Sequence, residues 1–167
     1  MRKNKKVALS AILSALATVI ICAGSVLGTV DIAIAVAASV CVLICSCEFG
    51  YKNALLIYIV VSILAFVLAP SKISAVLFTC LFGMYPVVKN YSEARFGKLM
   101  SYIVKYIYLN VAMIVFIVFV KVFLSAMPIL VYLVAVPVAN VVLPLYDFLM
   151  SEMIGFYYKR IRQIRKQ

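Results

Sequence analysis

The sequence predicts an all-α integral membrane protein, a bundle of six transmembrane helices with both termini in the cytoplasm. The chain of 167 residues is 68% hydrophobic and only 13% charged, whereas a soluble domain is about 45–50% apolar and about 25% charged. Its mean hydropathy is +1.20. A soluble fold of this size has too little interior for so much apolar surface, so lipid must be the solvent of most side chains.

Six apolar segments fill the chain and define one membrane domain, residues 1–167. A helix needs roughly 20 residues to cross the hydrocarbon core. The first segment follows the basic run MRKNKK, the second has Asp31 and Glu48 at its ends, and the third ends at APSK. The fourth ends at a Tyr-Pro pair followed by charged residues, and SAMP separates the fifth from the sixth. The predicted helices cover about 7–27, 29–49, 53–69, 73–88, 99–125 and 128–158, which leaves no room for a soluble catalytic domain.

The positions of lysine and arginine predict the orientation, because cytoplasmic loops carry an excess of both residues. With the N-terminus in the cytoplasm, 13 basic residues lie on the cytoplasmic side and only Lys72 lies in an outer loop. Both basic termini then share one side, which requires an even number of spans. The residues assigned to the cytoplasmic side are Arg2, Lys3, Lys5, Lys6, Lys52, Lys89, Arg95, Lys98, Lys159, Arg160, Arg162, Arg165 and Lys166.

Composition also argues against several classes of function. A net charge of +11 would suggest nucleic-acid binding in a soluble protein, but these charges flank apolar segments, so no nucleic acid is expected as a partner. The chain has five cysteines, all in apolar segments, and no histidine. Histidine acid–base catalysis is therefore excluded, and we predict no metal, no cofactor and no catalytic residue.

The first predicted helix carries a face of small residues that includes Ala11 and Ala15. Small residues let a second helix approach closely, so that dispersion and backbone contacts drive association in lipid. Such a face serves either packing within the bundle or docking against a partner membrane protein. The sequence leaves both interpretations open.

Ionisable residues in or beside the segments fall into two groups by depth. Such residues usually face the interior of a bundle, an interface or water. The cytoplasmic group is Glu48, Lys89, Glu93, Lys105, Asp147 and Glu152, and the outer group is Asp31, Lys72 and Lys121. We expect Glu48, Lys105 and Asp147 to form a belt of buried charge in which Lys105 pairs with Asp147 or Glu48. The belt is either purely structural, with snorkelling side chains, or part of a surface for a cytoplasmic partner.

Two further polar features stand out. Tyr85, Lys89 and Glu93 follow one another at one-turn spacing on the cytoplasmic side, where we expect them to contact a docking partner. Asn140 lies near the middle of the sixth segment with prolines on both sides. Because proline lacks an N–H, it leaves backbone carbonyl groups without their helical donors. These carbonyls either bind a polar ligand together with the Asn140 amide, or they lie at a helix kink and accept hydrogen bonds from neighbouring groups.

Taken together, these features resemble the S components of energy-coupling-factor (ECF) transporters, the substrate-capturing subunits of bacterial micronutrient uptake systems. The resemblance lies in the basic N-terminus leading into ALSAILSALA, in Ala11-x-x-x-Ala15, and in six predicted helices within 167 residues. The segments EFGYKNALLIYIVVSILAFVLAPSK and FGMYPVVK are similar to a subgroup of such proteins with no assigned substrate.

The resemblance implies a set of partners. Ala11 and Ala15 would contact the transmembrane coupling subunit, which joins a pair of ATPases from the cytoplasmic side. A small organic solute would bind toward the outer face, and the residues carried over by position are Asp31, Lys72, Lys121 and Asn140. The chain departs from the family at the loop near Gly28, which is too short for an extended lid. Without histidine, nickel and cobalt are not expected as substrates.

Two other functions remain open. A small polytopic scaffold or assembly protein without transport activity would use the same features only for helix packing and topology. An intramembrane lipid-modifying enzyme would need Glu48, Glu93 and Asp147 to converge with Lys89 or Lys105 at the cytoplasmic interface.

Overall fold

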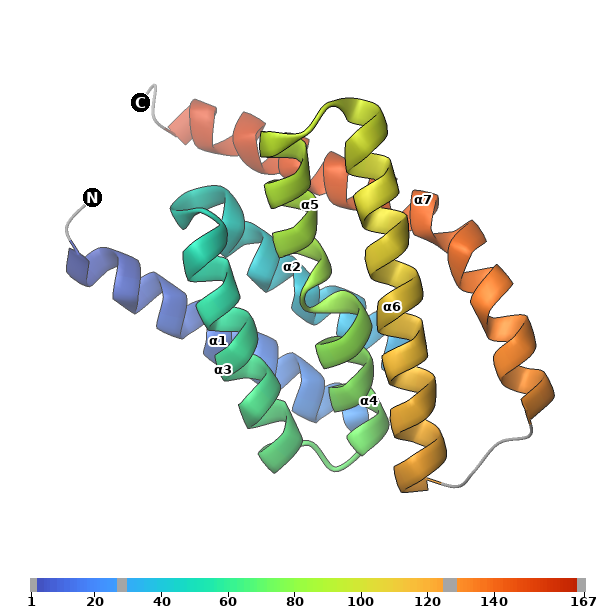
Figure 1. The fold of residues 1–167 in the computed structure, drawn as a ribbon. Helices are drawn as coiled ribbons and strands as arrows, with labels where there is room; N and C mark the ends of the chain where they lie inside the picture. Colours follow the sequence, from blue (N-terminus) through green and yellow to red (C-terminus); the bar gives the residue numbers. More distant parts are fainter. Residues whose placement is uncertain (1–2, 27–29, 125–128, 165–167) are drawn as a thin grey trace.

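The computed structural model describes residues 3–26, 30–124 and 129–164, and within them the side chains of residues 6–26, 30–122 and 136–159. Every element in these ranges is helical, and the elements run up and down through one bundle (Figure 1). In chain order they are α1 (Lys3–Ser25), α2 (Asp31–Phe49), α3 (Tyr51–Leu68), α4 (Lys72–Leu77), the π-helical turn η1 (Phe78–Phe82), α5 (Tyr85–Arg95), α6 (Lys98–Leu124) and α7 (Ile129–Ile164).

Six helices in the described part of the chain are long and apolar enough to cross a membrane, which is compatible with a multi-pass membrane protein. They are Lys6–Ser25, Asp31–Phe49, Tyr51–Leu68, Lys72–Arg95, Lys98–Val122 and Val136–Lys159. The predicted all-helical architecture with six helices of spanning length is thus confirmed. The fourth of them is a composite of α4, η1 and α5.

The helix ends differ from the predicted ones in informative places. The helix at the N-terminus begins at Lys3, inside the basic run, and α5 continues to Arg95 instead of ending near residue 88. Lys89 and Glu93 are therefore helical residues and not loop residues. The predicted ends at 27, 29, 125 and 128 lie outside the described residues.

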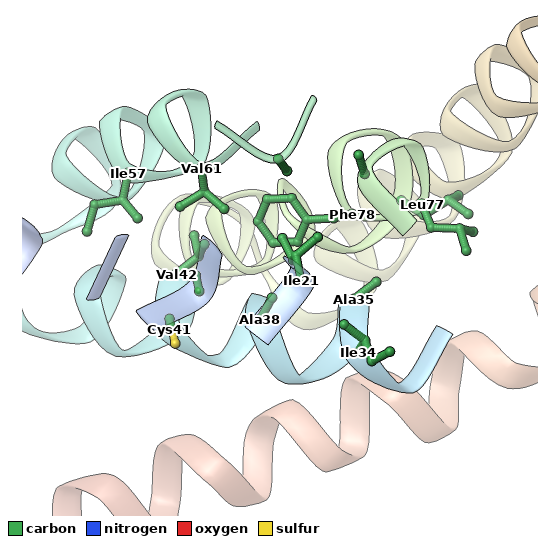
Figure 2. Packing of buried hydrophobic residues seen from close by; sticks show 14 of the residues in the cluster. Ile21, Ile34, Ala35, Ala38, Cys41, Val42, Ile57, Val61, Leu77 and Phe78 are labelled. Atoms are coloured by element: carbon green, nitrogen blue, oxygen red, sulfur yellow. The ribbon is translucent and has the colours of Figure 1, made fainter. Parts of the chain in front are cut away.

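The apolar core lies between α1, α2, α3 and the α4–η1 segment. Ile21 of α1, Val42 of α2, Val61 of α3 and Phe78 of η1 are fully or almost fully buried and point toward one another (Figure 2). Small residues bring the backbones together, because Ala17, Ala35, Ala38 and Ala54 are fully buried as well. The face of α1 that packs on the bundle is therefore the one with Leu13, Ala17 and Ile21.

The break within the fourth spanning helix lies next to a proline. Pro86 lacks the N–H that would continue the α-helical ladder, and the chain widens into a π turn just before it, where the Gly83 N–H donates to the Phe78 carbonyl at 2.6 Å. Two tyrosines bind carbonyls of this turn. The Tyr58 hydroxyl of α3 donates to the Thr79 carbonyl at 2.8 Å, and the Tyr108 hydroxyl of α6 donates to the Cys80 carbonyl at 3.0 Å.

The two described chain ends lie at the same end of the bundle, together with the α2–α3 and α5–α6 connections (Figure 1). The long helix α7 crosses the bundle obliquely and reaches this end with its C-terminal half (Figure 1). Here α7 meets α5 and α6, and this junction holds the candidate site.

Candidate functional site

Four charged side chains meet at the junction of α5, α6 and α7, and we call them the charge cluster: Lys89, Glu93, Lys105 and Asp147. Lys89 Nζ lies 2.6 Å from Asp147 Oδ1 and 3.1 Å from Glu93 Oε1. Lys105 Nζ lies 2.6 Å from Glu93 Oε1 and 3.0 Å from Asp147 Oδ1. Two ammonium groups and two carboxylates thus alternate within hydrogen-bonding distance.

Asp147 is the centre of the charge cluster. Its Oδ1 accepts hydrogen bonds from the Tyr85 hydroxyl at 2.7 Å, from Lys89 and from Lys105, while Oδ2 accepts a second bond from Lys105 at 3.0 Å. Lys89 also donates to the hydroxyl of Ser151 at 2.8 Å. Helical spacing explains the convergence, because Lys89 follows Tyr85 by one turn on α5 and Ser151 follows Asp147 by one turn on α7.

The burial of these charges is uneven. The side chains of Lys89, Lys105 and Asp147 are 0%, 2% and 7% exposed, whereas that of Glu93 is 43% exposed. An ammonium group buried without a partner would be costly, and it is tolerated only when paired and hydrogen-bonded. The cluster meets this condition because its two positive and two negative charges balance. Glu93 is the member that faces outward.

An open pocket of about 420 Å³ lies against the charge cluster, between the α5–α6 connection and α7; we call it the α5–α6–α7 pocket. On α6 its lining residues lie on one helical face, at Lys98, Ser101, Tyr102 and Lys105. The remaining lining residues are Glu93, Phe96, Asp147 and Ser151. Sequence reasoning did not single out Ser101 or Tyr102 as pocket residues, although their one-turn spacing from Lys98 and Lys105 was a readable signal.

Aromatic and hydroxyl groups surround the charge cluster on its inner side. The ring of Tyr85 packs on that of Tyr146, with centroids 4.9 Å apart. The hydroxyls of Tyr146 and Ser39 lie 2.9 Å apart, which links α7 to α2. The Ser101 hydroxyl donates to Ser92 at 2.9 Å and ties α6 to α5.

The expected members of the buried charge belt separate in the structure. Of the two partners considered for Lys105, Asp147 is the one it contacts. Glu48 lies apart from the cluster and accepts a hydrogen bond from the Tyr157 hydroxyl at 2.6 Å. Tyr85 and Lys89, expected at a docking surface, are 1% and 0% exposed and lie inside the junction, so Glu93 alone of those three presents its side chain outward.

The residues carried over for an outer solute site each make separate contacts. Asp31 accepts a hydrogen bond from Ser74, and Lys72 donates to the carbonyls of Phe66 and Ala69 at 2.8 and 3.1 Å. Asn140 and Asn110 form a reciprocal amide pair at 3.2 Å, and Lys121 is exposed. Within the described ranges, no hydrogen bond or ion pair joins any two of Asp31, Lys72, Lys121 and Asn140.

The small-residue face of α1 is divided by the fold. Ala17 and Thr18 are buried, while Ala11 and Ala15 are exposed. Beside Ala11 runs an open groove of about 360 Å³ between α1 and α3, and we call it the α1–α3 groove. Its lining residues are Lys6, Val7, Ser10, Ala11, Ser14, Asn53, Leu56, Ile57 and Val60.

Among the described residues, no group of three or more His, Cys, Asp or Glu is placed to hold a metal ion. The fold and the site therefore define an all-helical chain with six apolar helices and a buried, charge-balanced junction. Comparison of the chain with protein-family models, curated proteins and solved structures gives no significant match.

Proposed function

We propose that the chain is a multi-pass membrane protein that works as the substrate-capturing subunit of an ECF-type uptake transporter, with both termini in the cytoplasm. It binds a small organic solute from the outer side and delivers it when docked on a coupling module, which consists of a transmembrane subunit and two ATPases. The chain itself catalyses no reaction. The observation that carries this proposal is the exposure of Ala11 and Ala15 on α1 together with the α1–α3 groove that Ala11 lines.

Packing within the bundle does not account for these two alanines. The bundle buries the opposite side of α1, where Leu13, Ala17 and Ile21 lie in the core. In lipid an exposed alanine pair one turn apart offers a partner helix close backbone approach, which is the main source of helix association there. The adjoining α1–α3 groove widens this surface, and the exposed Lys6 that lines it provides hydrogen-bond donors for the partner.

The orientation and the solute site follow from charge and position. The basic residues gather at the end of the bundle where α1 begins and α5 ends, which supports a cytoplasmic location for that end. The solute site is then proposed at the opposite end, where Asp31 and Lys72 begin α2 and α4. Lys121 and Asn140 line the approach from α6 and α7 in this proposal.

Co-purification tests the docking. The full chain is extracted in mild detergent, and the eluate is examined for a large membrane subunit and for ATP hydrolysis by two nucleotide-binding subunits. Ala11→Trp and Ala15→Trp are expected to lose this complex. Ala33→Trp and Ala37→Trp are the matched controls, because these α2 alanines are also exposed and one turn apart; they should retain it. Equal recovery from all four variants would show that α1 is not the docking face.

A second candidate function gains support from the charge cluster. Two of the three carboxylates required for a lipid-modifying enzyme, Glu93 and Asp147, converge with both lysines considered for it, Lys89 and Lys105. The third required carboxylate, Glu48, lies elsewhere. The buried charged groups are nevertheless hydrogen-bonded to one another and to the hydroxyls of Tyr85 and Ser151. Turnover of a radiolabelled phospholipid by the purified chain would favour this function over transport.

The scaffold alternative predicts no solute. A thermal-stability screen of the purified protein against vitamins, nucleobases and amino-acid-like solutes separates it from the transport proposal, because a ligand that binds only the folded state stabilises it by mass action. A specific stabilising solute supports the capture subunit. Silence across the screen favours the scaffold.

A further inference from the structure

The α5–α6–α7 pocket has an excess of positive charge that the charge cluster does not use. The cluster is balanced, but Lys98 also lines the pocket and, among the described residues, forms no ion pair with a carboxylate. Three lysines thus stand against two carboxylates at this site. One bound monoanion would restore the balance.

The free hydrogen-bonding groups of the pocket are mostly donors. Lys105 and Lys89 direct their N–H groups to the cluster, whereas Lys98 is an exposed residue that forms none of the cluster's ion pairs. Tyr102, on the same face of α6, is 50% exposed. The pocket also opens at the start of α6, where the first N–H groups of a helix lack intrahelical acceptors and favour an anion. Gly97, which precedes α6, has no side chain to cap them.

Deeply buried polar groups form the floor of the pocket. Ser101, Lys105 and Asp147 line it, and as whole residues they are 3%, 2% and 5% exposed. The carboxylate of Glu93 lies at its edge, but Oε1 of this residue is held by both Lys89 and Lys105. The negative charge of Glu93 is therefore balanced by Lys89 and Lys105 and does not repel a bound anion strongly, while the positive charge of Lys98 has no such partner within the described ranges.

The flanks of the pocket are apolar. Phe96, which lines the pocket, is 41% exposed. Leu99 on α6 and Phe148 on α7 directly follow the lining residues Lys98 and Asp147, and they are 82% and 64% exposed. A polar pocket next to exposed apolar helix surface suits an amphiphile with a charged head and hydrocarbon tails.

We propose that the α5–α6–α7 pocket binds a phosphate group, with Lys98 as its principal cation and the Tyr102 hydroxyl as a second donor. The apolar flanks favour the phosphodiester of an anionic phospholipid as its source over free phosphate. This site is independent of the docking face on α1, because the two surfaces lie on different helices.

Purified full-length protein in a maltoside detergent, which contains no phosphate, allows a direct test. Thermal unfolding is followed with a thiol-reactive dye, since Cys41 and Cys45 are buried in the folded chain. Phosphatidylglycerol, diacylglycerol with the same acyl chains, and inorganic phosphate are titrated separately. The apparent Kd follows from the rise of the transition temperature with ligand concentration.

Phosphatidylglycerol should stabilise the protein and diacylglycerol should not. Lys98→Gln should weaken the apparent affinity at least about tenfold, which is the scale of one lost hydrogen bond to a charged group. Lys52→Gln is the matched control, because Lys52 is also an exposed lysine in the first turn of a helix at the same end; it should leave the affinity unchanged.

Stabilisation by inorganic phosphate alone, with the same dependence on Lys98, would support a phosphate site whose ligand is the free anion. Equal stabilisation by diacylglycerol and phosphatidylglycerol would overturn the proposal, because the tails would then account for binding. Equal weakening by Lys98→Gln and Lys52→Gln would also overturn it, since general attraction to a basic protein would suffice. The test uses the isolated chain, so it does not depend on a coupling partner.

Discussion

Removing the charge of Asp147 should destabilise the fold more than any other single charge change at this end of the bundle. Asp147→Asn keeps the shape of the side chain and an oxygen that can accept from the Tyr85 hydroxyl. It leaves Lys89 and Lys105, which are 0% and 2% exposed, with Glu93 as their only carboxylate. One buried ammonium charge is then uncompensated.

The expected loss follows from that geometry. Breaking a buried ion pair by removing one partner costs about 3–5 kcal/mol. The exposed side of Glu93 and the remaining amide oxygen favour the lower end of this range, so we predict about 3 kcal/mol for Asp147→Asn. Glu48→Gln is the control: it weakens a single hydrogen bond from Tyr157 at 2.6 Å, for which about 1 kcal/mol is expected.

The free energy of unfolding can be measured by denaturant titration in mixed micelles, with labelling of the buried Cys41 and Cys45 as the readout. The double variant Asp147→Asn with Lys105→Met tests the electrostatic reason, because it leaves Lys89 and Glu93 as a balanced pair at 3.1 Å. It should be more stable than Asp147→Asn alone. The reasoning would be refuted if the double variant were less stable than the single one, or if Asp147→Asn matched Glu48→Gln.

Three further predictions concern packing and polar pairs, each measured by the same unfolding titration. Gly24→Ala should cost about 1–3 kcal/mol of unfolding free energy by overpacking, because an added Cβ would lie within 3 Å of three Ile34 atoms. In the control Gly155→Ala the added Cβ has nothing within 4 Å, so this variant should be neutral or stabilising. Equal effects of the two variants would contradict the close approach of α1 to α2. Tyr108→Phe should cost about 1–3 kcal/mol of unfolding free energy, because it removes the hydroxyl that donates to the Cys80 carbonyl of the π turn. The control Tyr102→Phe changes a half-exposed residue and should stay within about 0.5 kcal/mol. An unchanged stability of Tyr108→Phe would mean that the turn does not need this hydrogen bond. Asn110→Leu and Asn140→Leu should each cost about 0.6–1.7 kcal/mol, the range for hydrogen bonds between membrane helices. The double variant should cost less than the sum of the two, because the amides pair with each other across α6 and α7. Strict additivity of the two losses would contradict this pairing.

Much of the architecture could be predicted from the sequence, because helix formation in an apolar chain depends on local properties. The apolar runs indicated the six long helices, and the predicted boundary at APSK lies close to the observed end of α3 at Leu68, whereas α1 begins inside the basic run. The π turn could not be predicted, since Pro86 removes one N–H but the way the chain absorbs that loss depends on Tyr58 and Tyr108 from distant segments.

The candidate site was only partly accessible for a similar reason. The sequence indicated that Lys105 and Asp147 carry buried charge, but it placed Lys89 and Glu93 on a separate docking surface. Whether these side chains meet Asp147 depends on the angle at which α5 and α7 cross, and the periodicity of a sequence does not predict a crossing angle. Glu48 illustrates the same limit, because the sequence predicts it in the same cytoplasmic group as Asp147, while in the structure its side chain contacts Tyr157.

Site-specific photocrosslinking in intact cells tests the proposed function most directly. A photoreactive amino acid at Ala11 or Ala15 should link this chain to a second integral membrane polypeptide that co-purifies with two ATPase subunits. The same group at Ala33 or Ala37, which are equally exposed on α2, should give no such product. Absence of the product from α1, or its formation equally from α2, would contradict the assignment of this chain as a docking, substrate-capturing subunit.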